Sequence, residues 1–276
     1  MNLLHSAAWR EALGQVPGAA SVGEVQIQTL AGGTNNSTFR VQTRQGAFVV
    51  RLHEPFSADL GVDRRREAVL HAAAANAGLA SRVLTADPQG RYLVTEFLDG
   101  TPWQASDMDD ESRLEALAQT LAQLHGLPAP AVPALDLSAL LERHVTQIAA
   151  QDAVAARNLL PQLARARDIL ATQAAAKRPA CIVHGDLTHS NVIGPDHPKL
   201  IDWEYAAVGD PLADLACLVA YYPGVLRHGA MLLRACGLSC RASLAALEEL
   251  AWVYHLLSKL WYRRLALARR HLPPAH

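Results

Sequence analysis

The chain has 276 residues, of which 50% are apolar and 18% charged, and its formal net charge is −1. This composition is typical of a globular protein with one large domain or two lobes, and the balanced charge gives no reason to expect nucleic acid or an anionic membrane as a partner. The N-terminus lacks a secretory signal and no apolar run reaches the ~18–20 residues of a membrane span, which predicts a cytoplasmic protein without a membrane partner.

The first hundred residues predict mainly β-structure. A short amphipathic helix comes first, and Gly, Thr, Asn and Ser cluster at 32–38 between two alternating segments. Arg64–Arg66, at the start of the predicted helix of this region, is interpreted as a solvated helix face. The predicted strands are 24–30, 39–43, 47–52, 83–85 and 92–97, and the helix is 63–77, ending at Gly78. Together they indicate an antiparallel sheet with one helix.

The composition changes after 98–101. Helices are predicted at 110–125, twice between 136 and 176, and from 212 onward, while 181–202 has the pattern of strands and loops. The sequence therefore predicts an α+β protein with a β-rich N-terminal lobe at 1–97, a hinge linker at 98–101 and a mainly helical C-terminal lobe at 102–276.

The most informative segment reads HGDLTHSN at 184–191, followed by IDW at 201–203. Phosphoryl transfer from ATP needs a carboxylate that accepts the hydroxyl proton, and an amide and a second carboxylate that hold Mg²⁺. We assign Asp186 as the catalytic base, Asn191 as a metal ligand and Asp202 as the principal Mg²⁺ ligand. His184 is interpreted as a core residue that supports the loop. The spacing matches the catalytic loop of protein kinases, although HGD alone has little specificity.

The N-terminal region contains the other parts of a nucleotide site. A turn of small residues lets backbone N–H groups approach phosphates, and a basic residue on the third strand, paired with an acid on the next helix, clamps them. Each part also has a simpler explanation: a hairpin loop, an exposed ion pair, and packing at a strand end. The predicted ATP-binding residues are Gly32, Gly33, Asn35, Asn36 and Ser37 in the turn, the pair Arg51 and Glu67, and Glu96 and Leu98, whose backbone groups face the adenine edge.

Taken together, these residues resemble the aminoglycoside phosphotransferase and choline kinase superfamily over most of the chain. The family pattern G-G-x-[TSN]-N-x-x-[YF] is found at 32–39, HGDLxxxN at 184–191, the Leu-x-x-Leu-His element at 121–125, and IDxEYAxxGDPxxDLA at 201–216. The resemblance implies a two-lobed protein-kinase-like fold and MgATP-dependent phosphorylation of a hydroxyl on a small molecule. It also implies that His125 and Asp214 are structural supports. The family often has Lys where this chain has Arg51, and Arg can still bind a phosphate and Glu67.

The form of the 201–206 segment resembles choline- and thiamine-kinase-like members. Eight of the fifteen aromatic residues lie after residue 200, and aromatic faces attract cations with roughly 0.5–2 kcal/mol each when desolvated. Core packing of helices explains such residues equally well. The candidate substrate residues are Asp186, Trp203, Glu204, Trp252, Trp261 and Tyr262.

The predicted function is thus an ATP- and Mg²⁺-dependent kinase for a small cationic alcohol of the choline or thiamine type. The alternative acceptors are a sugar, an aminoglycoside or another small alcohol. Two further alternatives are a metal-dependent phosphoesterase, which would need bridging ligands, and an inactive nucleotide-binding scaffold, which Asp186, Asn191 and Asp202 argue against.

Overall fold

The computed structural model describes residues 6–19, 25–30 and 36–270. Its N-terminal part is built on a five-stranded antiparallel sheet. The sheet order is β1-β2-β3-β5-β4. The strands are β1 (Gln26–Leu30), β2 (Asn36–Thr43), β3 (Gly46–His53), β4 (Val83–Ala86) and β5 (Tyr92–Glu96), and the helices of this part are α1 (Ala7–Gly14), η2 (Pro55–Leu60) and α2 (Arg64–Asn76). The strands and the helix predicted from the sequence are confirmed to within a few residues at their ends.

The rest of the chain is mainly helical and carries two small antiparallel ribbons. The helices are α3 (Glu111–His125), α4 (Leu137–Ala149), α5 (Ala153–Ala175), α6 (Leu212–Tyr221), α7 (Gly229–Ala235) and α8 (Leu244–Arg270), with short 3-10 turns η3 (Ala105–Asp109), η4 (His189–Asn191), η5 (Trp203–Tyr205) and η6 (Pro223–His228). The ribbons pair β6 (Cys181–Val183) with β9 (Ala207–Gly209), and β7 (Val192–Ile193) with β8 (Lys199–Leu200). The predicted α+β class is therefore confirmed.

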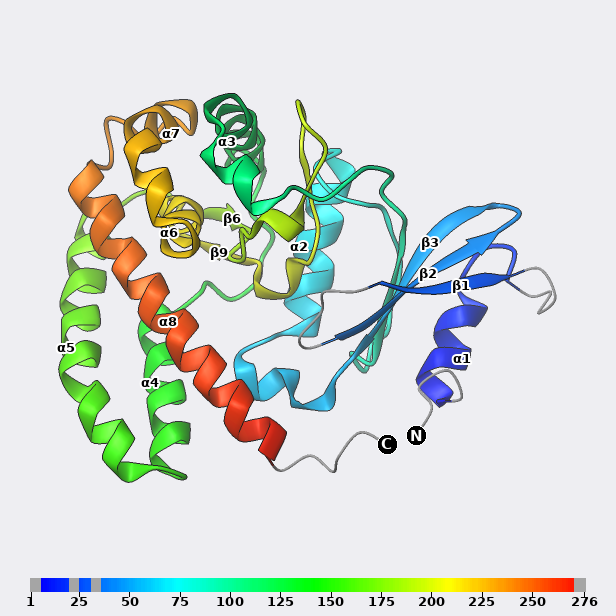
Figure 1. Ribbon diagram of the computed structural model, residues 1–276, viewed down its shortest axis with the longest axis horizontal. Coiled ribbons are helices and arrows are strands. Elements are labelled where there is room, and N and C mark those ends of the chain that lie inside the picture. The colour runs from blue at the N-terminus through cyan, green and yellow to red at the C-terminus, as the bar shows by residue number, and fades with distance from the viewer. Residues whose placement is uncertain (1–5, 20–24, 31–35, 271–276) are drawn as a thin grey trace.

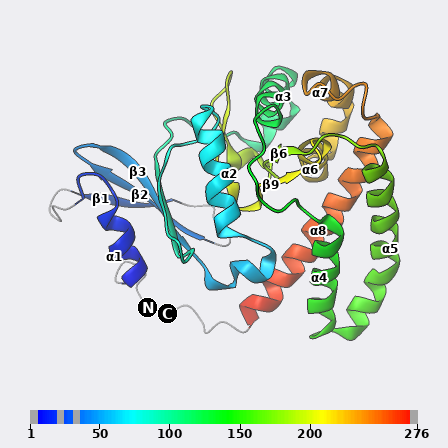
Figure 2. The ribbon, with the colours of Figure 1, turned by 180° about the vertical axis from the view of Figure 1, so that it is seen from behind.

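Each of the two parts has its own apolar core. One lies under the sheet, where Trp9 of α1 meets Phe39 edge to face with ring centroids 4.9 Å apart. The other fills the helical part and includes Leu70 and Ala74 of α2. Helix α2 therefore belongs to both parts of the molecule, and it lies between the sheet and the C-terminal helices (Figures 1 and 2). Side chains on α2 can consequently reach residues far away in the sequence.

Candidate active site

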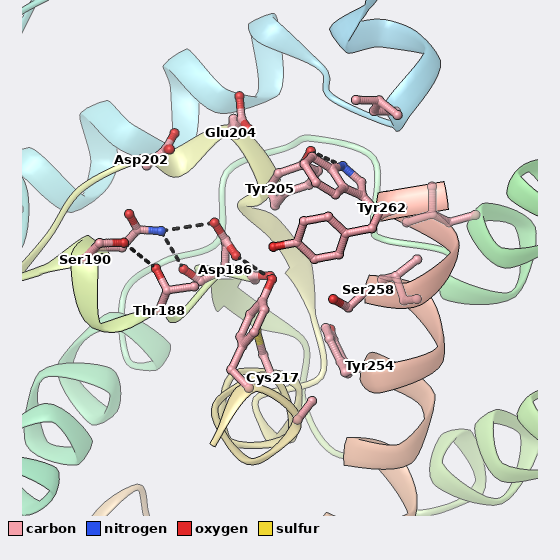
Figure 3. Close-up of a pocket in the computed structure, with 18 of the residues that line it drawn as sticks. Asp186, Thr188, Ser190, Asp202, Glu204, Tyr205, Cys217, Tyr254, Ser258 and Tyr262 are labelled. Atoms are coloured by element: carbon pink, nitrogen blue, oxygen red, sulfur yellow. Dashed lines mark hydrogen bonds between the residues drawn. The ribbon is translucent and has the colours of Figure 1, made fainter. Parts of the chain in front are cut away.

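The two ribbons bring both halves of the predicted catalytic motif to one place. The segment 184–191 leaves β6 and enters β7, and the segment 201–206 leaves β8 and enters β9. Because β6 pairs with β9 and β7 pairs with β8, the two connecting segments are held side by side. Figure 3 shows Asp186 from the first segment and Asp202 from the second on the same side of a pocket.

Asp186 has two side-chain donors. Asn191 Nδ2 donates to its Oδ2 over 3.0 Å and to its backbone carbonyl over 2.9 Å, and the Tyr221 hydroxyl donates to its Oδ1 over 2.9 Å. Burial raises the pKa of Asp186 to about 7, and the negative charge of Asp202 adds to this effect. A carboxyl whose pKa lies near neutrality is well suited to accept a proton from an alcohol. Asn191 uses its amide nitrogen on Asp186, so its carbonyl oxygen is the atom suited to a metal ion.

Asp214 fixes the backbone just before Asp186. Its side chain has no exposed surface and accepts hydrogen bonds from the backbone N–H groups of His184, at 3.0 Å, and Gly185, at 2.9 Å. His125 Nε2 lies 2.9 Å from the other carboxylate oxygen. Burial by itself favours the neutral acid, but these hydrogen bonds, that of His125 foremost, keep the pKa of Asp214 below its usual range.

Glycine is required at position 185. Its φ of +77° is disfavoured for other residues, and a Cβ atom there would lie 2.7 Å from the carbonyl oxygen of Tyr205. His184 is fully buried next to it, where its Nε2 lies 3.0 Å from the carbonyl oxygen of Ile201. The sharp turn between His184 and Asp186 thus keeps the two connecting segments in contact.

Arg51 forms an ion pair with Glu67, in the order anticipated from the sequence. Its Nη1 also lies 2.6 Å from Oδ1 of Asp202. Arg51 lies in the central strand β3, where it pairs with Leu93 on one side and Thr38 on the other. The N-terminal sheet therefore supplies a buried guanidinium directly against the carboxylate of the C-terminal segment.

Arg64 joins the two parts through Glu204, and the expectation that it belongs to a solvated helix face is wrong. Its side chain is 13% exposed, and its Nη1 lies 2.8 Å from Glu67 and 3.1 Å from Glu204. Its Nη2 donates to Asn36 Oδ1 over 2.9 Å and to Ser57 Oγ over 3.0 Å. The first turn of α2 faces the site, so an arginine there turns inward, while Arg65 is exposed.

Replacing Arg64 by Lys should weaken both the fold and the activity. A lysine ammonium is a point charge and cannot reproduce the planar contacts to four partners, so Glu67 and Glu204 would be partly unpaired. We expect a loss of about 1–3 kcal/mol of unfolding free energy and at least a tenfold lower kcat/KM for ATP. Urea unfolding and steady-state kinetics measure these effects. Arg65→Lys, on the same helical turn, is the control and should change neither; an equally active, equally stable Arg64→Lys protein would contradict the bridging role.

A cavity of about 230 Å³ opens next to Asp186. The catalytic segments line one side and α8 lines the other, and the Tyr262 hydroxyl points across the cavity toward Asp186 (Figure 3). Among the described residues that line the cavity there is no Lys or Arg. The lining includes three carboxylates and five aromatic side chains: Asp186, Asp202, Glu204, Tyr205, Tyr221, Tyr254, Trp261 and Tyr262. The lining of this cavity is therefore acidic and aromatic, and two of its carboxylates, Asp202 and Glu204, are paired with arginines that do not line it.

Of the four aromatic residues proposed to contact the substrate, two line the cavity and two do not. Trp261 and Tyr262 line the cavity, and Trp261 donates to the Tyr205 hydroxyl over 2.6 Å. Trp203 is fully buried in the core and donates to the carbonyl of Leu200, so it does not reach the cavity. Trp252 packs outside it, with the guanidinium of Arg165 on its ring. Core packing, the alternative explanation given for these aromatic residues from the sequence, is therefore the role of Trp203.

Glu204 lies in the cavity wall, where Asn36 Nδ2 donates to it over 2.8 Å. Burial, followed by the charge of Asp202, raises the pKa of Glu204. Its carboxylate is held by Asn36 and Arg64 and therefore serves the contact between the two parts as well as the cavity.

The other predicted nucleotide residues lie along the sheet. Asn36 and Ser37 begin β2, and the predicted turn residues Gly32, Gly33 and Asn35 lie outside the described residues. Glu96 ends β5 and forms an ion pair with Arg82 at the surface, and Leu98 follows it, half-buried. These two residues flank the connection from the sheet to the helical part.

The oxygen atoms of Asp202 and Asn191 suit Mg²⁺. Within the described ranges there is no cluster of three or more His, Cys, Asp or Glu side chains arranged for a metal. Mg²⁺ is commonly held by one or two protein oxygens together with water and phosphate oxygens, so a sparse set is sufficient. Burial raises the pKa of both Asp186 and Glu204, and the negative charge of Asp202 adds to this effect.

A two-lobed fold with an Asp–Asn–Asp set between a sheet and a helical part is the arrangement of a kinase. The sequence matches the family described as phosphotransferase enzyme family over residues 26–254, and the chain belongs to that family. Among curated proteins there is no significant match to this sequence.

Several solved structures share the fold. A choline/ethanolamine kinase family protein from Mesorhizobium loti is 22% identical with a TM-score of 0.73, and the alignment covers 96% of this chain and 89% of that one. Choline kinase LicA from Streptococcus pneumoniae is 18% identical with a TM-score of 0.73, covering 93% and 90%. The streptomycin–ATP ternary complex of aminoglycoside phosphotransferase APH(2'')-IIa is 16% identical with a TM-score of 0.64, covering 97% of both chains. The predicted kinase-like fold and superfamily are confirmed.

No helix in the part of the chain that the structure describes is long and apolar enough to cross a membrane.

Proposed function

We propose that this protein transfers the γ-phosphoryl group of ATP to the hydroxyl of a small cationic alcohol of the choline or thiamine type. The observation that carries the proposal is the cavity beside Asp186, which is lined by carboxylates and aromatic rings and by no Lys or Arg among the described residues. Carboxylates and aromatic faces together attract a cation, and the ring contribution is roughly 0.5–2 kcal/mol each. The cavity of about 230 Å³ is below the ~300–1,000 Å³ of pockets for drug-sized ligands, so it favours a small acceptor over a multi-ring aminoglycoside.

The nucleotide is placed on the side of Asp202 that faces away from the acceptor cavity. Arg51, held by Glu67, is placed to pair with phosphate oxygens, and the backbone after Glu96 leads into the connection where the adenine is expected. The APH(2'')-IIa complex, which has the same fold, contains ATP. Mg²⁺, held by Asp202 and Asn191, would neutralise the charge that develops on the phosphates.

Asp186 then acts on the acceptor. Its carboxylate, oriented by Asn191 and Tyr221, accepts the proton of the acceptor hydroxyl while the acceptor oxygen attacks the γ-phosphorus atom. The bond from that phosphorus atom to the β,γ-bridging oxygen breaks, and ADP is the leaving group. His125, His184 and Asp214 contact the loop and not the cavity, so we assign them a supporting role. We also propose the division of labour expected from the sequence, with the nucleotide on 1–97, a hinge at 98–101, and the acceptor site on 102–276.

An ADP-release assay with ATP, Mg²⁺ and one acceptor at a time tests this function. The panel comprises choline, ethanolamine, thiamine, kanamycin and N-acetylhexosamines. We expect turnover of a cationic alcohol, confirmed by mass spectrometry of the phosphorylated product. Turnover of a neutral sugar alone would contradict the cationic acceptor, and hydrolysis of p-nitrophenyl phosphate without ATP would indicate a phosphoesterase instead.

A further inference from the structure

One wall of the acceptor cavity carries a buried polar side chain whose hydrogen-bonding groups are unused. His144, on α4, is 1% exposed and lines the cavity. Within the described part of the chain neither of its ring nitrogens has a hydrogen-bond partner. Leaving a buried polar group unpaired is unfavourable, and about nine in ten such groups in folded proteins are paired. The two ring nitrogens of His144 are therefore candidates for hydrogen bonds to a molecule bound in the cavity.

The imidazole of His144 is neutral at physiological pH. Burial, then the charges of Arg264 and Arg143, lower its pKa to about 4. Arg264 is buried on α8, and Arg143 is exposed on α4. A neutral imidazole offers one N–H donor and one acceptor nitrogen. Two neighbouring arginines disfavour a cation here, so this wall suits an uncharged polar group that both donates and accepts.

His144 reaches the cavity from α4, whereas Asp186 reaches it from the segment between β6 and β7. Helix α4 packs against α8, and Leu140 of α4 and Leu257 and Ser258 of α8 also line the cavity. Figure 3 shows Ser258 with its hydroxyl pointing into the cavity, across from Asp186, Thr188 and Ser190. The catalytic segments thus supply carboxylates to the cavity, and α4 and α8 supply apolar and neutral polar groups as well as aromatic rings.

We propose that His144 determines acceptor specificity by hydrogen-bonding an uncharged polar group at the end of the acceptor opposite to the phosphorylated hydroxyl. His144 has this role only if the proposed kinase function holds. Between the two types of cationic alcohol, an acceptor whose cation carries an amino-substituted heteroaromatic ring satisfies His144. The aminopyrimidine of thiamine is such a group, whereas the trimethylammonium end of choline has neither a donor nor an acceptor.

A matched pair of acceptors tests this role. Thiamine and its 3-benzyl thiazolium analogue share the hydroxyethyl group and the cation, but the analogue has a phenyl ring in place of the aminopyrimidine. With the wild-type enzyme we expect kcat/KM to be about ten- to a hundredfold higher for thiamine, mainly through KM, because an unpaired buried polar group is unfavourable. Equal kcat/KM values for the two acceptors, or turnover of choline in preference to both, would overturn the proposal.

Two variants assign the effect to the side chain. His144→Phe keeps a ring without nitrogen atoms and should bring the thiamine-to-analogue ratio close to one, while His144→Gln, which retains a donor and an acceptor, should restore part of it. The fall in the thiamine-to-analogue ratio caused by His144→Phe should be the same at pH 6 and pH 8, because the imidazole of the wild-type protein is neutral at both pH values. An unchanged ratio in His144→Phe, or in His144→Leu if the first variant does not fold, overturns the role of His144 while wild-type turnover leaves the kinase function intact. If wild-type protein phosphorylates no alcohol in the panel, the proposed function itself fails.

Discussion

Asp186→Asn should lower turnover by two to four orders of magnitude and yet stabilise the metal-free protein at alkaline pH. Asn keeps the shape of Asp and can still hydrogen-bond Asn191 and Tyr221, but it accepts no proton. Removal of a positioned general base typically lowers the rate 10²–10⁴-fold, so we expect kcat to fall by about that factor with a much smaller change in KM for ATP. ADP release under saturating acceptor measures the effect.

The stability effect follows from the pKa of Asp186, which is about 7 in the folded protein against a usual 3.8. Because the folded-state pKa is raised, the protonated carboxyl contributes stability that is fully present below pH ~4 and is lost as the pH rises through ~7. At pH 8 the wild-type protein holds a buried anion that the variant lacks. Each pKa unit corresponds to about 1.4 kcal/mol, so the variant should gain a few kcal/mol at pH 8 and almost nothing at pH 4.

Thermal melts in EDTA at pH 4, 6 and 8 test this dependence. The matched control is Asp196→Asn, which changes an exposed carboxylate between β7 and β8. It should leave both activity and melting temperature unchanged. An Asp186→Asn protein that melts lower than wild type at pH 8 would show that Asp186 is not a destabilising buried anion. One that retains kcat within tenfold would show that Asp186 is not the base.

The parts of the site that lie on one short segment were the parts open to prediction from sequence. Asp186 and Asn191 are five residues apart, and Asp202 follows a two-residue strand, so local geometry alone brings them together. The sheet was predictable for a similar reason, because alternation along a strand such as β2 reflects burial on one face. Arg51 and Glu67 were predictable as a pair only through the order of strand and helix.

Contacts between distant segments were not predictable in this way. Arg64 contacts Glu204, which lies 140 positions further along the chain. The sequence around Arg64 hardly distinguishes it from its exposed neighbour Arg65. Its spacing of three from Glu67 was the one available signal, because residues three apart on a helix are neighbours. Trp203 and Trp261 are both aromatic residues near predicted helices or turns, and only packing decides that the first fills the core and the second lines the cavity.

Asp214→Ala should cause the largest loss of stability among single substitutions at the site. The carboxylate accepts hydrogen bonds from two backbone N–H groups and contacts the His125 ring, all in the interior. Removal of one partner of a buried charged group typically costs about 3–5 kcal/mol, because the remaining polar groups are desolvated and unpaired. The backbone at His184 and Gly185 would also lose its anchor, so kcat should fall together with stability, although Asp214 does not touch the cavity.

Asp214→Asn separates the two contributions of the carboxylate. Its carbonyl oxygen can still accept from His184 and Gly185, and its amide can donate to His125 in the other ring tautomer, so we expect less than half of the loss of the Ala variant. Urea unfolding of both variants, of His125→Ala and of the Asp214→Ala/His125→Ala double variant measures the coupling, expected at about 0.5–3 kcal/mol. Asp168→Ala, an exposed carboxylate on α5, is the control. Additive effects of Asp214 and His125 would mean that the two side chains act on the catalytic loop independently, contrary to the hydrogen bond that joins them.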